Sequence, residues 1–402
     1  MHSVLPQATT ATMTRATSPW IAILALYAAG LGAAGQFSKM AVILPQLGQS
    51  YPEAGAALGF LVSLLSLVGV VLGLVAGMLV ARLGFRRTLI GALTLGAAIS
   101  LLQGLLPPLP AMLALRVIEG GTHLAIVVAA PTLIAQVAPD PIRPAALTLW
   151  GTFFGVAFAV TALFGVPLAA RVGPGPLFAV HGVWMAAMAL LLLRLVPADR
   201  PTARTEQQLS LRALLRRHGE IYRSPFLSAP AWGWLFYTLT FVAVLAVWPP
   251  LLPERAGTLV ASLAPLAAIA VSMTLGVALL RRRSAIGVVL LGFALAAGLA
   301  LLLPLAPHSA APAIALFAAL GLVQGASFTA IAQLNQTAES RALANGALAQ
   351  MGNLGNMLGT PLMLAVLGLA GVRGMTAVIA ACYGAAFLTH LALDRARRRL
   401  RP

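Results

Sequence analysis

Residues 54–87 read AGAALGFLVSLLSLVGVVLGLVAGMLVARLGFRR. The segment 54–81 carries no charge, and the charges that follow it are all positive: Arg82, Arg86 and Arg87. A helix needs about 20 apolar residues to cross a bilayer core roughly 30 Å thick. The stretch therefore predicts a membrane-spanning helix that ends in a short basic loop, and arginines beside a span favour the cytoplasmic side.

The rest of the chain has the same character. Of its 402 residues, 60% are hydrophobic and 9% are charged, whereas soluble domains carry about 25% charged residues. So few charges cannot cover a water-facing surface, which excludes a cytosolic enzyme, a secreted domain and a nucleic-acid-binding module. The single cysteine, Cys382, excludes an internal disulfide and a cysteine-based metal site.

Apolar runs of spanning length occur on both sides of a polar central stretch, six before it and six after it. They cover residues 20–46, 54–81, 88–106, 110–138, 145–170, 175–197, 229–252, 257–280, 285–306, 311–337, 343–370 and 373–393. We therefore expect an all-α integral membrane protein with twelve transmembrane helices in two six-helix bundles. The expected parts are a cytoplasmic tail (1–19), an N-terminal bundle (20–197), a cytoplasmic linker (198–228), a C-terminal bundle (229–394) and a basic cytoplasmic tail (395–402). The linker is either a short amphipathic helix on the membrane face or a solvated linker with one or two helical turns.

The arginines orient these spans. With the N-terminus in the cytoplasm, only Arg171, Arg255 and Arg373 fall outside, and the other loop arginines fall inside. This distribution explains the net charge of +17 without a nucleic-acid partner. We expect a multi-pass protein of a bacterial cytoplasmic (inner) membrane with both termini cytoplasmic.

Several short motifs recur about half a chain length apart. The pairs are Gly77 and Arg82 with Gly276 and Arg281, residues 119–122 with 324–327, and Gly151 and Gly155 with Gly352 and Gly355. Their shared offset indicates duplication of a six-helix unit. Two such bundles facing each other hold the solute between them near the middle of the membrane in transporters built this way.

The loop from Gly77 to Arg87 resembles the signature loop of the major facilitator superfamily. Gly77, Arg82, Gly84, Arg86 and Arg87 fit that signature, whereas Ala81 replaces its acid and Phe85 a usually basic residue. The resemblance implies a twelve-helix secondary transporter that works by alternating access.

Two further motifs point to the same family. The segment 116–121, Arg-Val-Ile-Glu-Gly-Gly, is similar to the family's arginine motif, which is linked to proton coupling. Gly151 and Gly155 resemble the glycine motif of drug–proton antiporters, although Val156 stands where that motif has proline.

We interpret Gly77, Arg82, Gly84, Arg86 and Arg87 as a gating loop. The glycines permit close helix approach and a sharp turn. The arginines either cap helix carbonyls and bind lipid phosphates, or only fix the topology. In the family, the acid takes part in a charge relay that holds one conformation shut, so with Ala81 the lock has to be weaker or made elsewhere.

Glu119 is the only acid that falls inside an expected span. Arg116 lies three positions before it and His123 four positions after it, so a helix places all three on one face. We assign Glu119, His123 and Arg116 to proton coupling, because burial and a neighbouring cation act in opposite directions on a carboxylate and can alternate in strength. A static Arg116–Glu119 brace and direct substrate contact remain the alternatives.

Other polar and aromatic residues inside spans are candidates for contact with the solute. They are Gln36, Lys39, Tyr237, Gln324, Asn353 and Asn356. Lys39 together with Arg116 gives the cleft more positive than negative charge, which favours an anionic solute. The alternatives are hydrogen bonds between helices for the amides and a Lys39 side chain that reaches the outer interface.

No span contains a nucleophile with its base, a cluster of metal ligands or a phosphate-binding GxxxxGK[ST] loop. We expect no catalytic residue, no metal, no cofactor and no enzymatic activity. The predicted function is proton-coupled transport of a small organic solute, with an anionic metabolite favoured. The alternative is efflux of amphiphilic or cationic compounds by proton antiport, as in a drug exporter. The expected partners are the small-molecule substrate, protons and the lipid bilayer, and the expected functional unit is a monomer.

Overall fold

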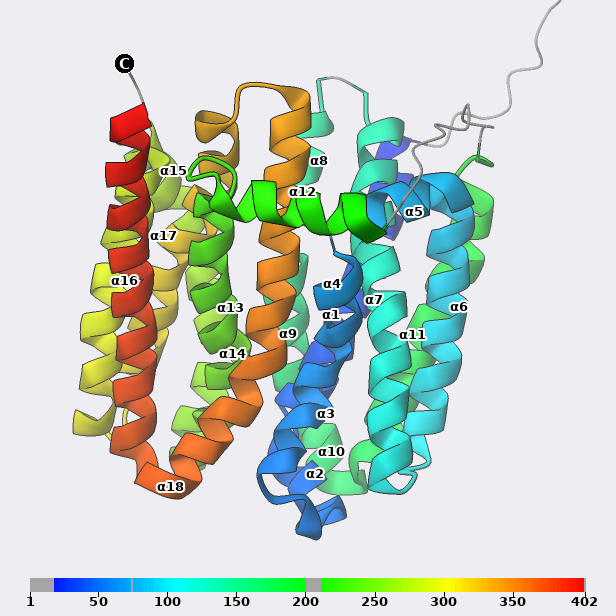
Figure 1. The fold of residues 1–402 in the computed structure, drawn as a ribbon. Coiled ribbons are helices and arrows are strands. Elements are labelled where there is room, and N and C mark those ends of the chain that lie inside the picture. Colours follow the sequence, from blue (N-terminus) through cyan, green and yellow to red (C-terminus); the bar gives the residue numbers. More distant parts are fainter. Residues whose placement is uncertain (1–17, 74, 140, 200–210, 401–402) are drawn as a thin grey trace, which may run out of the picture.

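The computed structural model describes residues 18–73, 75–139, 141–199 and 211–400, and the regular secondary structure in these ranges is helical. Most of the expected tail 1–19 and residues 200–210 of the expected linker lie outside the described ranges. The long helices run alongside one another between two ends of the molecule, and α12 (Leu211–Arg223) lies across one end (Figure 1). The linker therefore contains a helix of 13 residues, which is longer than one or two turns.

Six crossings form the N-terminal half. The first is α1 (Pro19–Ala41), followed by the short α2 (Leu44–Ser50), and the third, fourth and sixth are α6 (Phe85–Gly104), α7 (Leu109–Val137) and α11 (Pro174–Leu195). The second is broken into η1 (Pro52–Leu58), α3 (Gly59–Ser63), η2 (Leu64–Ser66), α4 (Leu67–Leu72) and α5 (Ala76–Leu83). The fifth comprises α8 (Arg143–Trp150), α9 (Phe153–Val160), η3 (Thr161–Gly165) and α10 (Val166–Val172).

The C-terminal half repeats this plan. Its helices are α13 (Ala229–Val247) with η4 (Pro249–Leu251), α14 (Glu254–Val271) with η5 (Ser272–Gly276) and α15 (Val277–Leu280), α16 (Ala285–Leu302) with η6 (Leu303–Leu305), α17 (Ala311–Leu334) and α18 (Ala338–Leu400). The fifth crossing of the chain and the eighth each contain a π-helical turn, η3 and η5. Pro167 follows η3 and has no N–H to donate, which gives a reason for the widened turn there.

The last two expected spans lie in α18, which bends sharply at Gly371 (Figure 1). The Gly371 backbone has φ +63° and ψ −167°, a conformation that glycine adopts without a steric penalty. Eleven described helical segments are long and apolar enough to cross a membrane, and the last of them, Leu343–Leu400, contains both of these expected spans. The twelve-helix fold is therefore confirmed.

The two halves share an apolar core towards the end where Trp248 lies. Phe37 and Met40 of α1 belong to one buried cluster with Val244 of α13 and Trp248. The opposite end of the molecule, where Arg82, Arg86 and Arg87 lie, is called the arginine-rich end. Towards it, the buried clusters of the described residues stay within one half or join the C-terminal half to α12. The structure is thus closed by apolar packing at the Trp248 end.

The duplication is visible in the helix contacts. Gly120 of α7 lies so close to η2 that an added Cβ would fall 2.1 Å from the Leu65 carbonyl oxygen. Gly321 of α17 has the same relationship, at 2.1 Å, to the Ala268 carbonyl oxygen of α14. The fourth and tenth crossings therefore pack against the second and eighth in the same manner.

Candidate functional site

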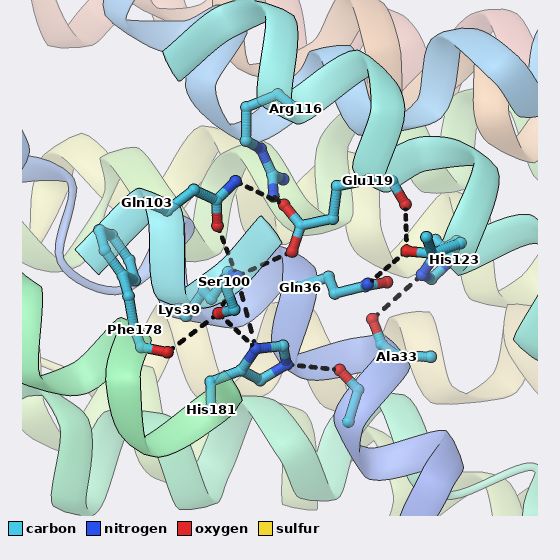
Figure 2. A network of polar contacts seen from close by, with 12 residues as sticks. Ala33, Gln36, Lys39, Ser100, Gln103, Arg116, Glu119, His123, Phe178 and His181 are labelled. Atoms are coloured by element: carbon cyan, nitrogen blue, oxygen red, sulfur yellow. Dashed lines mark hydrogen bonds and ion pairs between the residues drawn. The ribbon is translucent and has the colours of Figure 1, made fainter. Parts of the chain in front are cut away.

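A network of charged and polar side chains lies inside the N-terminal half, between α1, α6, α7 and α11 (Figure 2). Its cation is Lys39, whose side chain is 1% exposed. The Lys39 Nζ lies 2.7 Å from Ser100 Oγ, 2.7 Å from Gln103 Oε1 and 2.7 Å from Glu119 Oε1. An ammonium group has three hydrogens to donate, so each has an acceptor.

Glu119 lies between two cations. Its Oε1 accepts from Lys39, and its Oε2 accepts from Arg116 Nη1 and, at 2.8 Å, from Gln103 Nε2. Both Glu119 and Arg116 are fully buried. The carboxylate and the two cations therefore form one charged cluster in which the acid is shared.

Arg116 also connects α7 to the broken second crossing. Its Nε donates to the Leu61 carbonyl oxygen at 2.6 Å, and its Nη2 lies 3.4 Å from the Val62 carbonyl oxygen. The helix tightens into the 3₁₀ turn η2 directly after these residues, and carbonyls at such a helix end need other donors. Arg116 supplies them.

Two imidazoles border the network in different ways. The His181 Nε2 donates to the Gly32 carbonyl oxygen at 2.8 Å, so its Nδ1 faces Ser100 Oγ at 2.8 Å and Lys39 Nζ at 3.4 Å with a lone pair. His123 Nδ1 donates to the Ala33 carbonyl oxygen at 3.0 Å. The structure shows no hydrogen bond between the described side chains of His123 and Glu119, although both lie on α7.

The network contains more positive than negative charge. Lys39 and Arg116 are cations and Glu119 is the only described carboxylate bonded to either, so with neutral imidazoles the cluster carries one net positive charge. Removing charged groups from water is costly unless they are paired and hydrogen-bonded. The hydrogen bonds from the amide and hydroxyl groups partly offset that cost.

The location of Lys39 differs from both interpretations of its sequence position. It neither reaches the outer interface nor faces the cleft as a free cation, because Ser100, Gln103 and Glu119 hold it inside the N-terminal half. The Phe178 ring also lies against it, with 5.5 Å between Nζ and the ring centroid. The three acceptors inside the bundle replace the water that the ammonium loses on burial.

Sequence reasoning missed Ser100 and Gln103. They are three residues apart in α6, so they share a helix face. Polar residues at that spacing inside an apolar run were the available signal. Gln36 joins the network through Thr122: its Nε2 donates to Thr122 Oγ1 at 2.8 Å, and Thr122 donates to the Glu119 backbone carbonyl at 2.7 Å.

The other candidates for solute contact lie in the C-terminal half. Tyr237 is buried and stacks between Trp234 and Phe241, with ring centroids 4.5 Å and 5.1 Å away. Asn353 lies against Gly69 of α4, across the boundary between the halves, and bonds to the Ala349 carbonyl. Gln324 is half-buried on α17, and the buried Asn356 Oδ1 has no hydrogen-bond partner among the described residues. None of the four is hydrogen-bonded to the charged network.

The expected gating loop is only partly as predicted. Gly84 has φ +94° and makes the sharp turn between α5 and α6. Gly77 is exposed within α5 with no atom near an added Cβ, so the close helix approach expected of it is wrong. Arg86 Nη2 donates to the Leu193 carbonyl at 2.7 Å, which confirms helix capping for that arginine. Arg82 and Arg87 are exposed.

An acid from elsewhere in the chain binds this loop. Asp199, just after α11, accepts from the backbone N–H groups of Arg86 at 2.9 Å and Arg87 at 3.0 Å. A carboxylate at a helix N-terminus is stabilised by the free N–H groups and the helix dipole. Asp199 thus fixes the start of α6 to the segment that follows α11.

An open cavity of about 550 Å³ lies between α6 and α7. Its lining includes Arg87, Gly91, Leu95, Ile118 and Thr122. Leu95 and Ile118 are about half exposed. The cavity lies within one half, so it is not the site between the bundles where transporters of this architecture bind solute.

Comparisons with known proteins agree with this architecture. The family model described as Major Facilitator Superfamily matches residues 20–360. No curated protein sequence matches the chain.

Solved structures show the same fold at low sequence identity. A bacterial homologue of the human lysosomal transporter Spinster, solved in an inward-facing and unoccupied conformation, has TM-score 0.73 and 16% identity, with 94% of this chain and 97% of that chain covered. A mutant of the nucleoside transporter NupG has TM-score 0.73 and 16% identity, with 94% and 100% covered. The human organic anion transporter MFSD10 (TETRAN) has TM-score 0.66 and 16% identity, with 93% and 100% covered.

The family match covers most of the chain, and the twelve-helix fold agrees with it. The chain therefore belongs to the Major Facilitator Superfamily and is a multi-pass membrane transporter rather than an enzyme.

Proposed function

We propose that this protein is a secondary active transporter that moves a small organic solute by alternating access and couples that movement to protons. The observation that carries the proposal is the charged cluster of Lys39, Arg116 and Glu119, buried inside one half of the molecule. Ionisable groups inside membrane-spanning helices are costly, and they mark ion and proton pathways in transporters.

A static brace would need only the Arg116–Glu119 pair, and the cluster contains more than that pair. Arg116 and Glu119 alone would join one turn of α7 to α3, with no net charge. Lys39 adds a second buried cation and links α1, α6 and α7 through Ser100, Gln103 and Glu119. A change of protonation in such a cluster changes the attraction between helices, which is the property that a coupling centre needs.

One helix of the cluster reaches the boundary between the halves. Helix α1, which carries Lys39, also contacts α13 of the C-terminal half. A shift of α1 relative to α7 would therefore alter the contact between the two bundles. This connection supports alternating access driven by protonation, with the N-terminal half as the coupling half.

We assign solute contacts to the C-terminal half and its boundary. Gln324, Asn353 and Asn356 lie there and offer neutral hydrogen-bonding groups, and Tyr237 lies there with its ring stacked between Trp234 and Phe241. Lys39 and Arg116 are both bound to Glu119, so they give no free positive charge for an anion in this conformation. Solved relatives named as nucleoside and organic anion transporters are consistent with a small organic solute.

A second candidate function is export of amphiphilic or cationic compounds in exchange for protons. A row of aromatic rings in the C-terminal half favours it: Trp234 contacts Tyr237 and Phe328, and Phe241 contacts Tyr237 and Phe317, with ring centroids between 4.5 and 5.1 Å apart. Aromatic faces attract apolar groups and cations. Phe328 is about half exposed, so part of this row is accessible.

The experiment has two steps. A thermal-shift screen of purified protein with nucleosides, carboxylates and lipophilic cations identifies a ligand, because binding to the folded state raises its stability. Transport of that ligand is then measured in proteoliposomes with and without an imposed pH gradient. We expect the gradient to drive accumulation by the wild type but not by Glu119→Gln, which still exchanges ligand at equilibrium.

The matched control is Glu254→Gln, at the exposed start of α14. It should behave as the wild type does. Wild-type flux that is the same with and without the pH gradient would refute proton coupling. Stabilisation by lipophilic cations alone, with the gradient driving their export, would favour the second candidate.

A further inference from the structure

We infer that Lys39, rather than Glu119, is the group that releases and rebinds the coupling proton. The inference rests on the proposed function and names the group that changes charge. It comes from the arrangement of the cluster: one carboxylate bonded to two cations, with an imidazole lone pair 3.4 Å from the ammonium nitrogen.

The net charge left in the cluster differs between protonation of Glu119 and deprotonation of Lys39. Protonating Glu119 would leave Lys39 and Arg116 as two buried cations with no described carboxylate bonded to either. Removing a proton from Lys39 would instead leave a neutral Arg116–Glu119 pair and an uncharged amine. An uncompensated buried charge is the costly arrangement, so the low-cost change of protonation takes place on Lys39.

The surroundings of the two groups agree with this count. Glu119 accepts hydrogen bonds from Lys39, Gln103 and Arg116, and each favours the charged carboxylate. Arg116 is unsuitable as a proton donor because guanidinium stays protonated in proteins. Lysine is the cation that loses its proton readily when buried.

The step itself needs one acceptor. An N–H bond of the Lys39 ammonium breaks, its electron pair stays on Nζ, and the proton passes by way of Nδ1 of His181 to water outside the cluster. That nitrogen carries a lone pair because Nε2 donates to the Gly32 carbonyl oxygen. The neighbouring Ser100 hydroxyl donates its one hydrogen to the Phe178 carbonyl oxygen at 3.0 Å. The described charged or titratable side chains bonded or electrostatically coupled to Lys39 come from α7 and α11: Arg116 and Glu119, and His181. From α6 the contacts are the neutral Ser100 and Gln103.

The release of the proton also weakens the link between helices. A neutral amine donates two hydrogens instead of three, and its attraction to Glu119 is lost. The bonds from Lys39 to α6 and α7 hold this part of α1 together with the hydrogen bonds of Gln36 to Thr122 and of His123 to Ala33. Deprotonation therefore weakens the attachment of α1 to α7, whereas Arg116 keeps α7 attached to α3.

The first test uses the wild type. Infrared difference spectra between low and high pH, on protein with ¹³C-labelled glutamate, report whether a carboxylic acid forms. We expect Glu119 to give no carboxylic-acid C=O band at either pH. A band from Glu119 would be recognised because it is present in the wild type and absent in Glu119→Gln. Such a band, tracking the pH transition, would overturn the assignment to Lys39.

The second test measures the distance between the two halves against pH. Cys382 is the only cysteine, so Cys382→Ala permits spin labels at Glu53→Cys and Arg373→Cys, both exposed. We expect the wild-type distance distribution to shift through one midpoint. Lys39→Arg should keep the low-pH distribution and Lys39→Gln the high-pH distribution at all pH values, and the control His123→Gln should still shift.

The outcomes distinguish the two proposals. If the wild type neither shifts with pH nor responds to a pH gradient in proteoliposomes, proton coupling itself fails. If the wild type shifts and a folded Lys39→Arg shifts with the same midpoint, proton coupling stands and the role of Lys39 is wrong. The infrared measurement decides the point even if the arginine variant does not fold.

Discussion

Gln350 of α18 donates a hydrogen bond of 2.8 Å to the backbone carbonyl of Val70 on α4, and so joins the C-terminal half to the N-terminal half. Its Oε1 accepts from the Tyr222 hydroxyl at 2.7 Å, and its Nε2 lies 3.2 Å from His218 Nε2. Both of these residues belong to the linker helix α12. One amide thus connects the two halves and the linker at the arginine-rich end.

Removing this amide should loosen that end of the molecule. A hydrogen bond contributes about 0.5–1.5 kcal/mol, so Gln350→Ala should raise the open fraction by about 2- to 12-fold. Burial raises the pKa of Tyr222 to about 12, so its hydroxyl remains protonated and available as a donor at neutral pH. Hydrogen–deuterium exchange of residues 211–223 measures the effect. Asn345→Ala, whose amide bonds to Arg341 on the same helix, is the control, and equal exchange in both variants would exclude the connection.

Glu119 should be more important for folding than either cation alone. Removing one partner of a buried ion pair costs about 3–5 kcal/mol, and Glu119→Gln leaves two cations behind. Adding Lys39→Gln removes one of them, so the double variant should recover part of the loss. Unfolding free energies of the two single variants and the double variant form a cycle with an expected coupling of about 0.5–3 kcal/mol. Strictly additive effects would show that the two residues act independently.

Asp199 should stabilise the start of α6. Replacing a residue that caps a helix by alanine costs about 0.5–2 kcal/mol. We expect Asp199→Ala to lower the melting temperature more than Asp199→Asn, because the asparagine oxygen can still accept a hydrogen bond from Arg86 or Arg87. Differential scanning fluorimetry in detergent tests this order. A melting temperature unchanged in Asp199→Ala would show that the two hydrogen bonds contribute nothing to stability.

Two neighbouring glycines of α7 offer a matched comparison. A Cβ at Gly120 would fall 2.1 Å from the Leu65 carbonyl oxygen, whereas a Cβ at Gly121 would meet no atom within 4 Å. Gly120→Ala should therefore cost about 1–3 kcal/mol through overpacking. Gly121→Ala should be neutral or stabilise the protein by up to about 1 kcal/mol, because alanine favours the helix. Denaturation of both variants in the same detergent tests the difference, and equal stabilities would contradict the close contact of α7 with η2.

Much of the fold follows from local patterns. The twelve apolar runs predicted the twelve crossings because the length of a spanning helix is fixed by the thickness of the bilayer. The Arg116–Glu119 pair was also predictable, because residues three positions apart in a helix lie on the same face. The same spacing rule places His123 on the helix face of Glu119, but the His123 side chain bonds to Ala33 of α1 instead of Glu119.

The sequence by itself determined the membrane-spanning helices, their division into two halves and the presence of one acid inside a span. Each of these depends on residues that are neighbours along the chain. Only the tertiary structure decided that Ser100, Gln103, Glu119 and His181 meet around Lys39, and that Asp199 caps α6. Spacing along a helix determines which face a side chain occupies, but the packing and rotation of whole helices decide what that face meets.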